Sequence, residues 1–129
     1  MVRFIGTLLI AIFALAGTAF AQNLPIPSVW ENERGSIMKA LDGHASNGDF
    51  HGTYINNVGS RCRGTPYDLT GQVDGTRVVF TVVWKNSAED CRSKTVWRGD
   101  IAGRTLVTTW ILTRENGDVL RGSDTFRLQ

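Results

Sequence analysis

The residues that could do chemistry in this 129-residue chain are polar side chains that share strand faces with large aromatic rings. Four strand-like runs with polar same-face neighbours each contain a tryptophan: Trp30, Trp84, Trp97 and Trp110. The polar neighbours are Asn32, Ser93, Thr95, Thr108 and, on a last strand, Asp124. An unpaired buried polar group costs roughly 1 to 3 kcal/mol, so an ordinary core excludes such residues. A ligand cavity with aromatic walls and a few aimed polar groups requires both kinds.

The same residues do not form a pattern that is typical of catalysis. The sequence shows no set of nucleophile, base and orienting group, and one inward carboxylate does not make an acid/base pair. The two histidines, His44 and His51, are too few and too isolated for a metal site, and we expect them on the surface. The sequence therefore predicts a binding protein that is not an enzyme and that uses no metal or cofactor.

The elements that must position these residues are strands. Period-two alternation of apolar and polar residues predicts eight of them, at about 28–32, 36–41, 50–56, 67–73, 77–84, 95–102, 105–113 and 123–128. Short connections, several with Asp-Gly or Asn-Gly, join adjacent antiparallel strands. We expect an all-β fold, an eight-stranded antiparallel up-and-down β-barrel, because closure removes exposed edges.

Alternate connections of such a barrel lie at the same end. The stretches 33–35, 57–66, 85–94 and 114–122 would therefore share one rim, close to the tryptophans and their polar neighbours. We expect this end to be the mouth of a pocket. The other half of the inward face is expected to be an apolar plug that includes Phe80, Val82, Leu106 and Phe126.

The N-terminus has the pattern of a signal peptide. Arg3, an apolar run over 4–16 and the small-x-small sequence 19–21 predict cleavage after residue 21. A membrane anchor is the alternative, but the apolar run is shorter than the roughly 20 residues that a spanning helix needs. Residues 22–129 would then form one domain of a secreted or periplasmic protein.

The charge balance of the mature chain excludes another class of partner. Removing Arg3 from 14 basic residues leaves 13, against 12 acidic residues, and the two signs alternate along the chain. A nucleic-acid groove requires clustered Lys and Arg, so we expect no nucleic-acid partner, and we expect no membrane partner either.

The chain has two cysteines, Cys62 and Cys91, and export would permit one disulfide between them. Both fall in alternate connections of the same rim, so a bridge is topologically reasonable. Such a bridge would contribute roughly 3 to 4 kcal/mol by chain entropy. Two free thiols are the alternative.

Seven short motifs stand in a fixed order along the expected strands. They are Trp30-x-Asn32-x-x-Gly35-Ser36, Gly52-Thr53-Tyr54, Leu69-Thr70-Gly71, Trp84-Lys85-Asn86, Ser93-x-Thr95-x-Trp97, Thr109-Trp110-Ile111-Leu112 and Gly122-Ser123-Asp124-Thr125-Phe126. In order and spacing, the chain from about Ser28 to Leu128 resembles the avidin and streptavidin family of biotin-binding proteins. Within that family, its cysteine pair is similar to the short, dimeric bacterial members of the rhizavidin type.

The resemblance implies high-affinity, non-covalent biotin binding and assigns polar roles. Three donors would meet the ureido oxygen of biotin: Asn32, Ser36 and Tyr54. Asp124 would accept a hydrogen bond from one ureido N–H and Asn56 from the other. Thr95 would face the ring sulfur.

The resemblance also assigns the walls and the rim of the pocket. The bicyclic ring and tail would lie against Trp84, Trp97, Trp110, Leu112 and Val58. The carboxylate would meet Ser93 and the backbone around Gly59 and Ser60. Trp30 would be mainly a core residue near the barrel floor.

Three departures from the better-known relatives affect these expectations. The stretch 114–121 lacks the aromatic residue that tetrameric relatives lend to a neighbouring subunit, so we expect a homodimer. Arg34 stands where those relatives carry a small or aliphatic residue, and we expect it to point to solvent, with contact to a carboxylate as the alternative. The rim stretch 59–63 is basic, with Arg92 expected close by, and these cations could attract the ligand carboxylate weakly.

Two other classes of protein remain as alternatives. A lipocalin-like carrier of an apolar ligand would have a wider, mostly aliphatic interior without the three-donor cluster. A secreted inhibitor or adhesion module that acts through its loops would not require polar residues inside the barrel.

Overall fold

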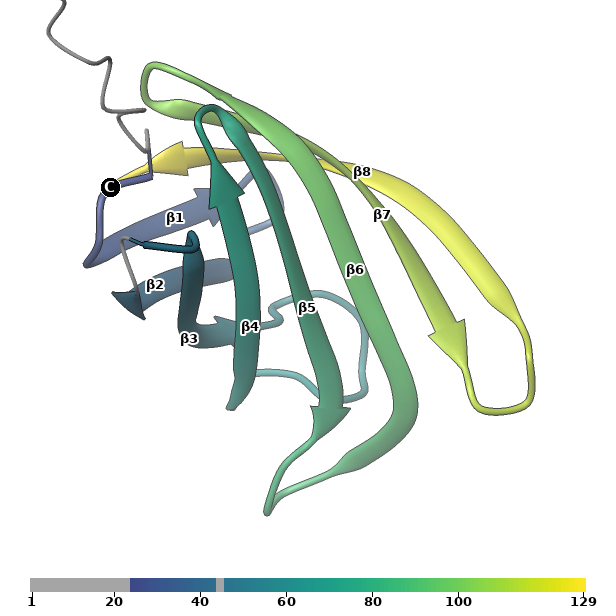
Figure 1. Ribbon diagram of the computed structural model, residues 1–129. Helices are drawn as coiled ribbons and strands as arrows, with labels where there is room; N and C mark the ends of the chain where they lie inside the picture. The colour runs from purple at the N-terminus through teal and green to yellow at the C-terminus, as the bar shows by residue number, and fades with distance from the viewer. Residues whose placement is uncertain (1–23, 44–45) are drawn as a thin grey trace, which may run out of the picture.

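The computed structural model describes residues 24–43 and 46–129, so the expected signal peptide lies outside the described residues. Eight strands follow one another around a closed barrel, each antiparallel to the next, and the last pairs with the first (Figure 1). They are β1 (Ser28–Asn32), β2 (Ile37–Gly43), β3 (Asp49–Ile55), β4 (Pro66–Asp74), β5 (Arg77–Lys85), β6 (Asp90–Ala102), β7 (Thr105–Arg114) and β8 (Val119–Leu128). The predicted fold class is therefore confirmed.

The strands on one side of the barrel are much longer than those on the other (Figure 1). Strand β6 begins at Asp90, five residues before the expected start, and β8 begins at Val119, four residues early. The first residues of β6 are mostly polar, and β8 begins with the apolar pair Val119 and Leu120, so neither start alternates between apolar and polar residues. The ladder nevertheless continues through them, since Ser93 pairs with Arg114 and Val119 pairs with Thr113. Backbone pairing therefore extends these strands beyond the closed part of the barrel.

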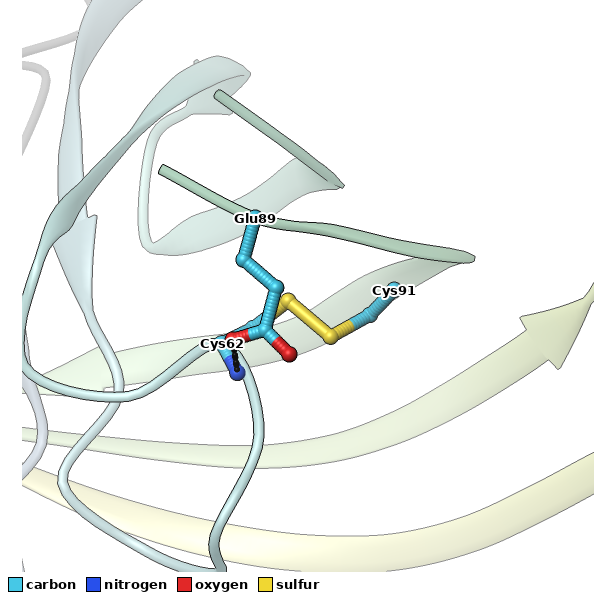
Figure 2. Close-up of side chains that lie close together, drawn as sticks. All are labelled: Cys62, Glu89 and Cys91. Carbon is cyan, nitrogen blue, oxygen red and sulfur yellow. Dashed lines mark hydrogen bonds between the residues drawn. A yellow bond between two sulfur atoms is a disulfide. The ribbon is translucent and has the colours of Figure 1, made fainter. Parts of the chain in front are cut away.

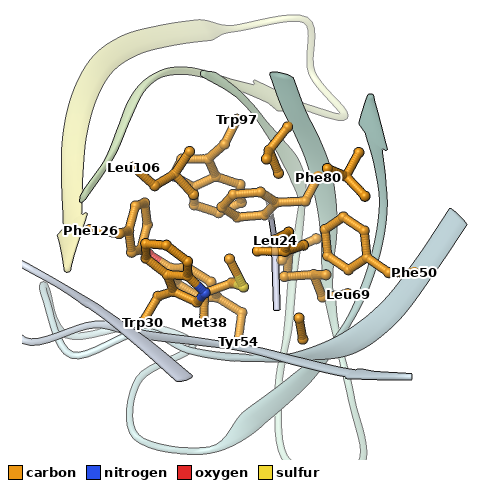
Figure 3. Packing of buried hydrophobic residues seen from close by; sticks show 14 of the residues in the cluster. Leu24, Trp30, Met38, Phe50, Tyr54, Leu69, Phe80, Trp97, Leu106 and Phe126 are labelled. Atoms are coloured by element: carbon orange, nitrogen blue, oxygen red, sulfur yellow. The ribbon is translucent and has the colours of Figure 1, made fainter. Parts of the chain in front are cut away.

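The floor of the barrel, the half away from the 33–36, 56–65 and 115–118 connections, is packed with large apolar side chains. Figure 3 shows these side chains converging from opposite walls. The largest fully buried ones are Trp30, Met38, Phe50, Phe80, Leu106 and Phe126. Burying one such side chain contributes about 1.5 to 3 kcal/mol. Phe80, Val82, Leu106 and Phe126 are all buried as expected.

Trp30 belongs to this floor, as expected. Its side chain is fully buried, and its indole Nε1 donates a hydrogen bond of 2.9 Å to Ser28 Oγ on the same strand. Leu24, which precedes β1, is also buried in the cluster (Figure 3). The floor is thus closed by strand residues and by the segment that leads into β1.

Among the described residues, no helix has the length and apolar character needed to span a membrane.

Candidate ligand-binding site

A cavity of about 260 Å³ opens at the end of the barrel where the connections before β2, β4, β6 and β8 lie. Most residues expected to bind a ligand line it. These are Asn32, Ser36, Tyr54, Asn56, Val58, Trp84, Ser93, Thr95, Trp97, Trp110, Leu112 and Asp124. The structure therefore brings together residues from six strands and two connections at the end predicted to be the mouth.

Backbone groups hold the acceptor atoms of Asn32 and Ser36 and so set the direction of their donors. Asn32 Oδ1 accepts hydrogen bonds from the backbone N–H of Arg34 at 3.0 Å and of Ser36 at 2.9 Å. These donors fix the orientation of the amide, which leaves its NH₂ group available toward the cavity. Ser36 Oγ accepts a hydrogen bond of 3.0 Å from the backbone N–H of Asn57. The Ser36 hydroxyl proton is therefore available as a second donor.

The third donor that lines the cavity is the hydroxyl of Tyr54. Burial raises the pKa of the Tyr54 phenol well above its usual range, and the nearby Asp124 carboxylate raises it further. The phenol consequently keeps its proton at every physiological pH and remains a donor. Its ring is held by Trp97 at a centroid distance of 4.7 Å and by Trp84 at 5.7 Å.

Asp124 is a buried carboxylate with one oxygen engaged. Its Oδ2 accepts a hydrogen bond of 2.9 Å from Trp97 Nε1, and its backbone oxygen accepts one of 2.9 Å from Thr108 Oγ1. Burial raises the pKa of Asp124, and the Trp97 hydrogen bond opposes this shift. A ligand N–H that met the remaining oxygen, Oδ1, would stabilise a charge that the protein otherwise solvates poorly.

The tryptophans of the cavity wall are fixed by polar and steric contacts. Trp84 Nε1 donates a hydrogen bond of 2.8 Å to Thr95 Oγ1, which holds both side chains. The rings of Trp84 and Trp97 meet edge to face at a centroid distance of 6.3 Å. Trp110 lies over Gly122, where an added Cβ would be only 2.2 Å from Trp110 Cζ2. The walls are therefore preformed, which lowers the ordering cost of binding a ligand.

Asn56 organises the 56–65 connection between β3 and β4. Its Nδ2 donates a hydrogen bond of 2.9 Å to the Val58 carbonyl, and its Oδ1 accepts one of 3.2 Å from the Val58 backbone N–H. Gly59 and Ser60, which follow, are exposed and do not line the cavity. In this structure the turn that Asn56 closes leaves both residues outside the cavity lining, and a contact of their backbone with the ligand carboxylate stays a prediction.

The expected disulfide between Cys62 and Cys91 is present, with Cα atoms 6.3 Å apart. Figure 2 shows Glu89 against this bridge. Glu89 Oε2 accepts a hydrogen bond of 2.8 Å from the Cys62 backbone N–H, and Oε1 accepts one of 3.2 Å from Arg61 Nε. These two contacts, the Cys62 one first, lower the pKa of the Glu89 carboxyl. The bridge and the carboxylate together tie the β3–β4 connection to the start of β6.

Cys62, Glu89 and Cys91 also form a group of potential metal ligands in the described part of the chain. Their ligand atoms lie within 4.8 Å of one another. The disulfide, however, uses both sulfur atoms, and metal binding requires thiolates. This cluster therefore stabilises the loop in the oxidised protein and does not offer a metal site.

Three arginines outside the predicted set of binding residues also line the cavity: Arg34, Arg61 and Arg114. Arg61 belongs to the basic rim stretch that was expected to attract a ligand carboxylate weakly. Arg34 is exposed, as expected for a solvent-facing residue, but it also forms part of the mouth. Arg63 and Arg92 do not line the cavity, and Arg63 Nη1 instead donates to the Gly59 carbonyl at 3.1 Å. In loops no alternation of apolar and polar residues indicates the direction of a side chain. In the sequence, only the short distance from these arginines to the site motifs could have suggested that they line the cavity.

A closed barrel with a preformed, partly polar cavity at one end defines a binder of one small ligand. The chain belongs to the Avidin family, whose family model matches residues 20–127.

Known members support this assignment. The chain is 40% identical over 111 residues to afifavidin from Afifella pfennigii. This match covers 80% of this chain and 69% of afifavidin. A structure of short afifavidin in complex with biotin is similar with a TM-score of 0.75 and 39% identity, covering 86% of this chain and 94% of that one. The crystal structure of rhizavidin is similar with a TM-score of 0.73 and 37% identity, over 79% and 81% of the two chains.

Proposed function

We propose that this chain binds biotin tightly and without covalent chemistry, at one site per chain. The observation that carries the proposal is that Asn32, Ser36 and Tyr54 all line the cavity. The oxygens of Asn32 and Ser36 accept hydrogen bonds from the backbone, and Tyr54 keeps its proton, so all three are left as donors. Biotin carries a ureido oxygen, a strong acceptor that such a cluster suits. Membership of the Avidin family and the biotin complex of short afifavidin support the same ligand.

The two ureido N–H groups of biotin would find acceptors on either side of these donors. Asp124 offers its Oδ1 on one side, because Trp97 holds Oδ2. Asn56 Oδ1 lies on the other side, and its contact with the Val58 N–H leaves one lone pair for the ligand. The ureido group would therefore be satisfied at all three polar positions, as a tightly bound polar group must be.

The ring and tail of biotin would lie among the aromatic walls. Trp84, Trp97 and Trp110 would enclose them together with Leu112 and Val58, and burial of this apolar surface adds affinity at about 25 cal/mol per Å². Thr95, whose Oγ1 accepts from Trp84, keeps a hydroxyl proton for the ring sulfur. Ser93 lies at the cavity edge, where the tail would leave.

Titration calorimetry of the mature protein tests this function. We expect one biotin per chain and a higher thermal midpoint in its presence, since a ligand that binds only the folded state stabilises it. A titration with biotin that gives no heat, together with an unchanged thermal midpoint of the protein, would contradict the proposal. Binding of long apolar ligands in preference to biotin would instead favour a lipocalin-like carrier, for which the polar cluster in this cavity offers no support.

We propose that the protein works as a binder and not as an enzyme, and that it is exported. Within the described part of the chain, the cavity lining includes the carboxylate of Asp124 and several hydroxyls, but no histidine to activate them. The disulfide is typical of an oxidising compartment, such as the periplasm or the exterior. Recovery of the protein with an intact bridge from the cytosolic fraction would contradict this location.

We propose further that the chain forms a homodimer. The outer faces of β5, β7 and β8 expose Val83, Val107 and Val119, which is apolar area that a partner could cover. The last hairpin, 114–121, has no aromatic residue to lend to a neighbour. Light scattering during size exclusion should give the mass of two chains, and the mass of four would refute the proposal.

A further inference from the structure

Three guanidinium groups from three different parts of the chain line the mouth of the cavity. Arg34 comes from the β1–β2 connection, Arg61 from the β3–β4 connection, and Arg114 from the end of β7. All three are exposed, whereas the acidic residue among the cavity-lining residues, Asp124, is buried. The mouth therefore has an excess of positive charge where a ligand would enter and where its outer end would remain.

The three cations differ in how far acidic neighbours compensate them. Arg61 lies 3.2 Å from Glu89 and Arg114 lies 3.9 Å from Asp118. Arg34 has no ion pair among residues 24–43 and 46–129. The adjacent Glu33 turns to β8, where its Oε2 accepts a hydrogen bond of 2.7 Å from the Thr125 backbone N–H.

The charge of Arg34 also reaches the interior of the cavity. Burial raises the pKa of Asp124, and Arg34 is one of the groups that oppose this rise. Arg34 opposes the rise in the Tyr54 pKa as well. The Glu33 carboxylate raises the pKa of the same two residues and has the larger effect, so among the described residues Arg34 is uncompensated by an ion pair at the mouth but not in the interior.

We propose that Arg34, Arg61 and Arg114 make this site selective for biotin as the free acid over biotin whose tail is linked as an amide. The inference depends on the proposed biotin site, in which the ureido end meets the buried donors and the tail ends at the mouth. The free acid has a negative charge at that end at neutral pH, and an amide, such as a biotinyl-lysine of a protein, has none. The free small molecule is then bound more tightly than a biotinylated protein.

The expected preference is moderate and depends on salt. One exposed ion pair changes an equilibrium by up to about fivefold. Three guanidinium groups on separate loops act nearly additively, so we expect an acid-to-amide preference of about tenfold or more at low salt. Screening shortens the range of these charges to roughly 3 Å at 1 M salt, so concentrated salt should remove most of this preference.

Displacement of radiolabelled biotin tests the selectivity, with unlabelled biotin and neutral biotinamide as competitors. At about 20 mM salt we expect biotinamide to compete about tenfold more weakly than biotin, and at about 500 mM salt the two should approach each other. Biotinamide has the same ring system and tail length, so the salt-dependent part of the difference reports the carboxylate charge.

Substitution of the arginines identifies which of them carry the selectivity. Arg34→Gln, Arg61→Gln and Arg114→Gln should each weaken biotin binding at low salt and leave biotinamide almost unchanged, with Arg34→Gln having the largest effect. Arg77→Gln removes the same charge at the other end of the barrel and is the matched control. Thermal unfolding of each variant verifies that it is folded.

The outcomes separate the two proposals. Equal competition by biotin and biotinamide at low salt would overturn the selectivity and leave the biotin site intact. A preference that survives in the triple glutamine variant would also overturn the role of these arginines. Failure of labelled biotin to bind at all would refute the proposed function, and the selectivity with it.

Discussion

The floor and the mouth of this barrel are built on the same inward strand positions and yet have opposite compositions. On β6 the inward residues change from Ile101 near the floor to Thr95 and Ser93 at the cavity. On β8 they change from Phe126 to Asp124 over one repeat of the alternation. The floor contributes stability through apolar burial, whereas the mouth retains polar groups whose remaining hydrogen bonds are left for a ligand. Stability and recognition are thus segregated along the barrel axis.

The largest effect should come from the floor. Leu106→Ala should lower the free energy of unfolding by about 2–5 kcal/mol, because the lost side chain is fully buried and leaves a cavity. Its neighbour Val107 is 56% exposed, and Val107→Ala should change stability by less than about 0.5 kcal/mol. Urea unfolding of both variants measures this difference. Equal losses would show that the two faces of β7 are not as unlike as the structure indicates.

The disulfide should be the largest stabilising feature of the mouth. Replacing Cys62 and Cys91 together with serine should cost about 2–4 kcal/mol, because the bridge spans 29 residues and restricts the unfolded chain. The same loss should follow treatment of the native protein with a thiol, and the thiol should not affect the double variant. Biotin should also leave the double variant faster. Unchanged release would show that the loop is rigid without the bridge.

A substitution at Asp124 should weaken ligand binding without lowering the stability of the fold, unlike the substitutions above. Asp124→Asn should weaken biotin about 10- to 100-fold, through loss of a charge-assisted hydrogen bond of about 1.5–3 kcal/mol. The same substitution should not lower stability at neutral pH, since a buried charge is removed and an acceptor for Trp97 Nε1 remains.

The pH dependence of stability gives an independent test that Asp124 is a buried carboxylate. Because the folded pKa of Asp124 is raised above 3.8, the folded state binds its proton more tightly than the unfolded state does. Its contribution to stability is therefore complete below 3.8 and is lost as the pH rises through the folded value. Urea unfolding from pH 4 to 7 should show this loss in the native protein and not in Asp124→Asn. Asp68→Asn, on an exposed position of β4, is the control.

Glu89 should give the smallest effect, on ligand release. Glu89→Gln weakens the contacts to the Cys62 N–H and to Arg61, so biotin should dissociate about two- to fivefold faster. Because the folded pKa of Glu89 is lowered, these contacts persist above its usual value of 4.5 and are lost as the pH falls through the folded value. Stopped-flow measurement of release tests this, with Glu115→Gln as the control. Identical rates would show that the carboxylate does not restrain the loop.

The sequence predicted the strand residues of the site better than the loop residues, for a physical reason. Within strands the alternation determines which side chains point inward, so Trp97, Thr95 and Asp124 could be placed in the cavity before the structure was known. In the connections no such period exists. The direction of Gly59 and Ser60 depends on how Asn56 closes its turn, and the position of Arg34 depends on the hydrogen bonds of Asn32.

The strand ends show the same dependence on context. The starts of β6 and β8 lack the alternation of apolar and polar residues, and pairing with β7, which lies between them, decides their conformation. The apolar interior of β5, in contrast, is evident from Val78, Phe80 and Val82, which are all buried. The alternation of apolar and polar residues therefore predicts the part of a strand that packs in the core. Pairing with neighbouring strands determines the part that extends beyond the core.

The contact between Trp110 and Gly122 means that the width of the pocket depends on a residue that does not itself line the pocket. A methyl group at position 122 would be too close to the indole to fit beside it, so the ring would have to move. A single added carbon on β8 would thus reshape the cavity from behind, without altering any atom that a ligand would touch. A substitution at position 122, natural or engineered, could therefore change the affinity for the ligand and leave the ligand's hydrogen bonds in place.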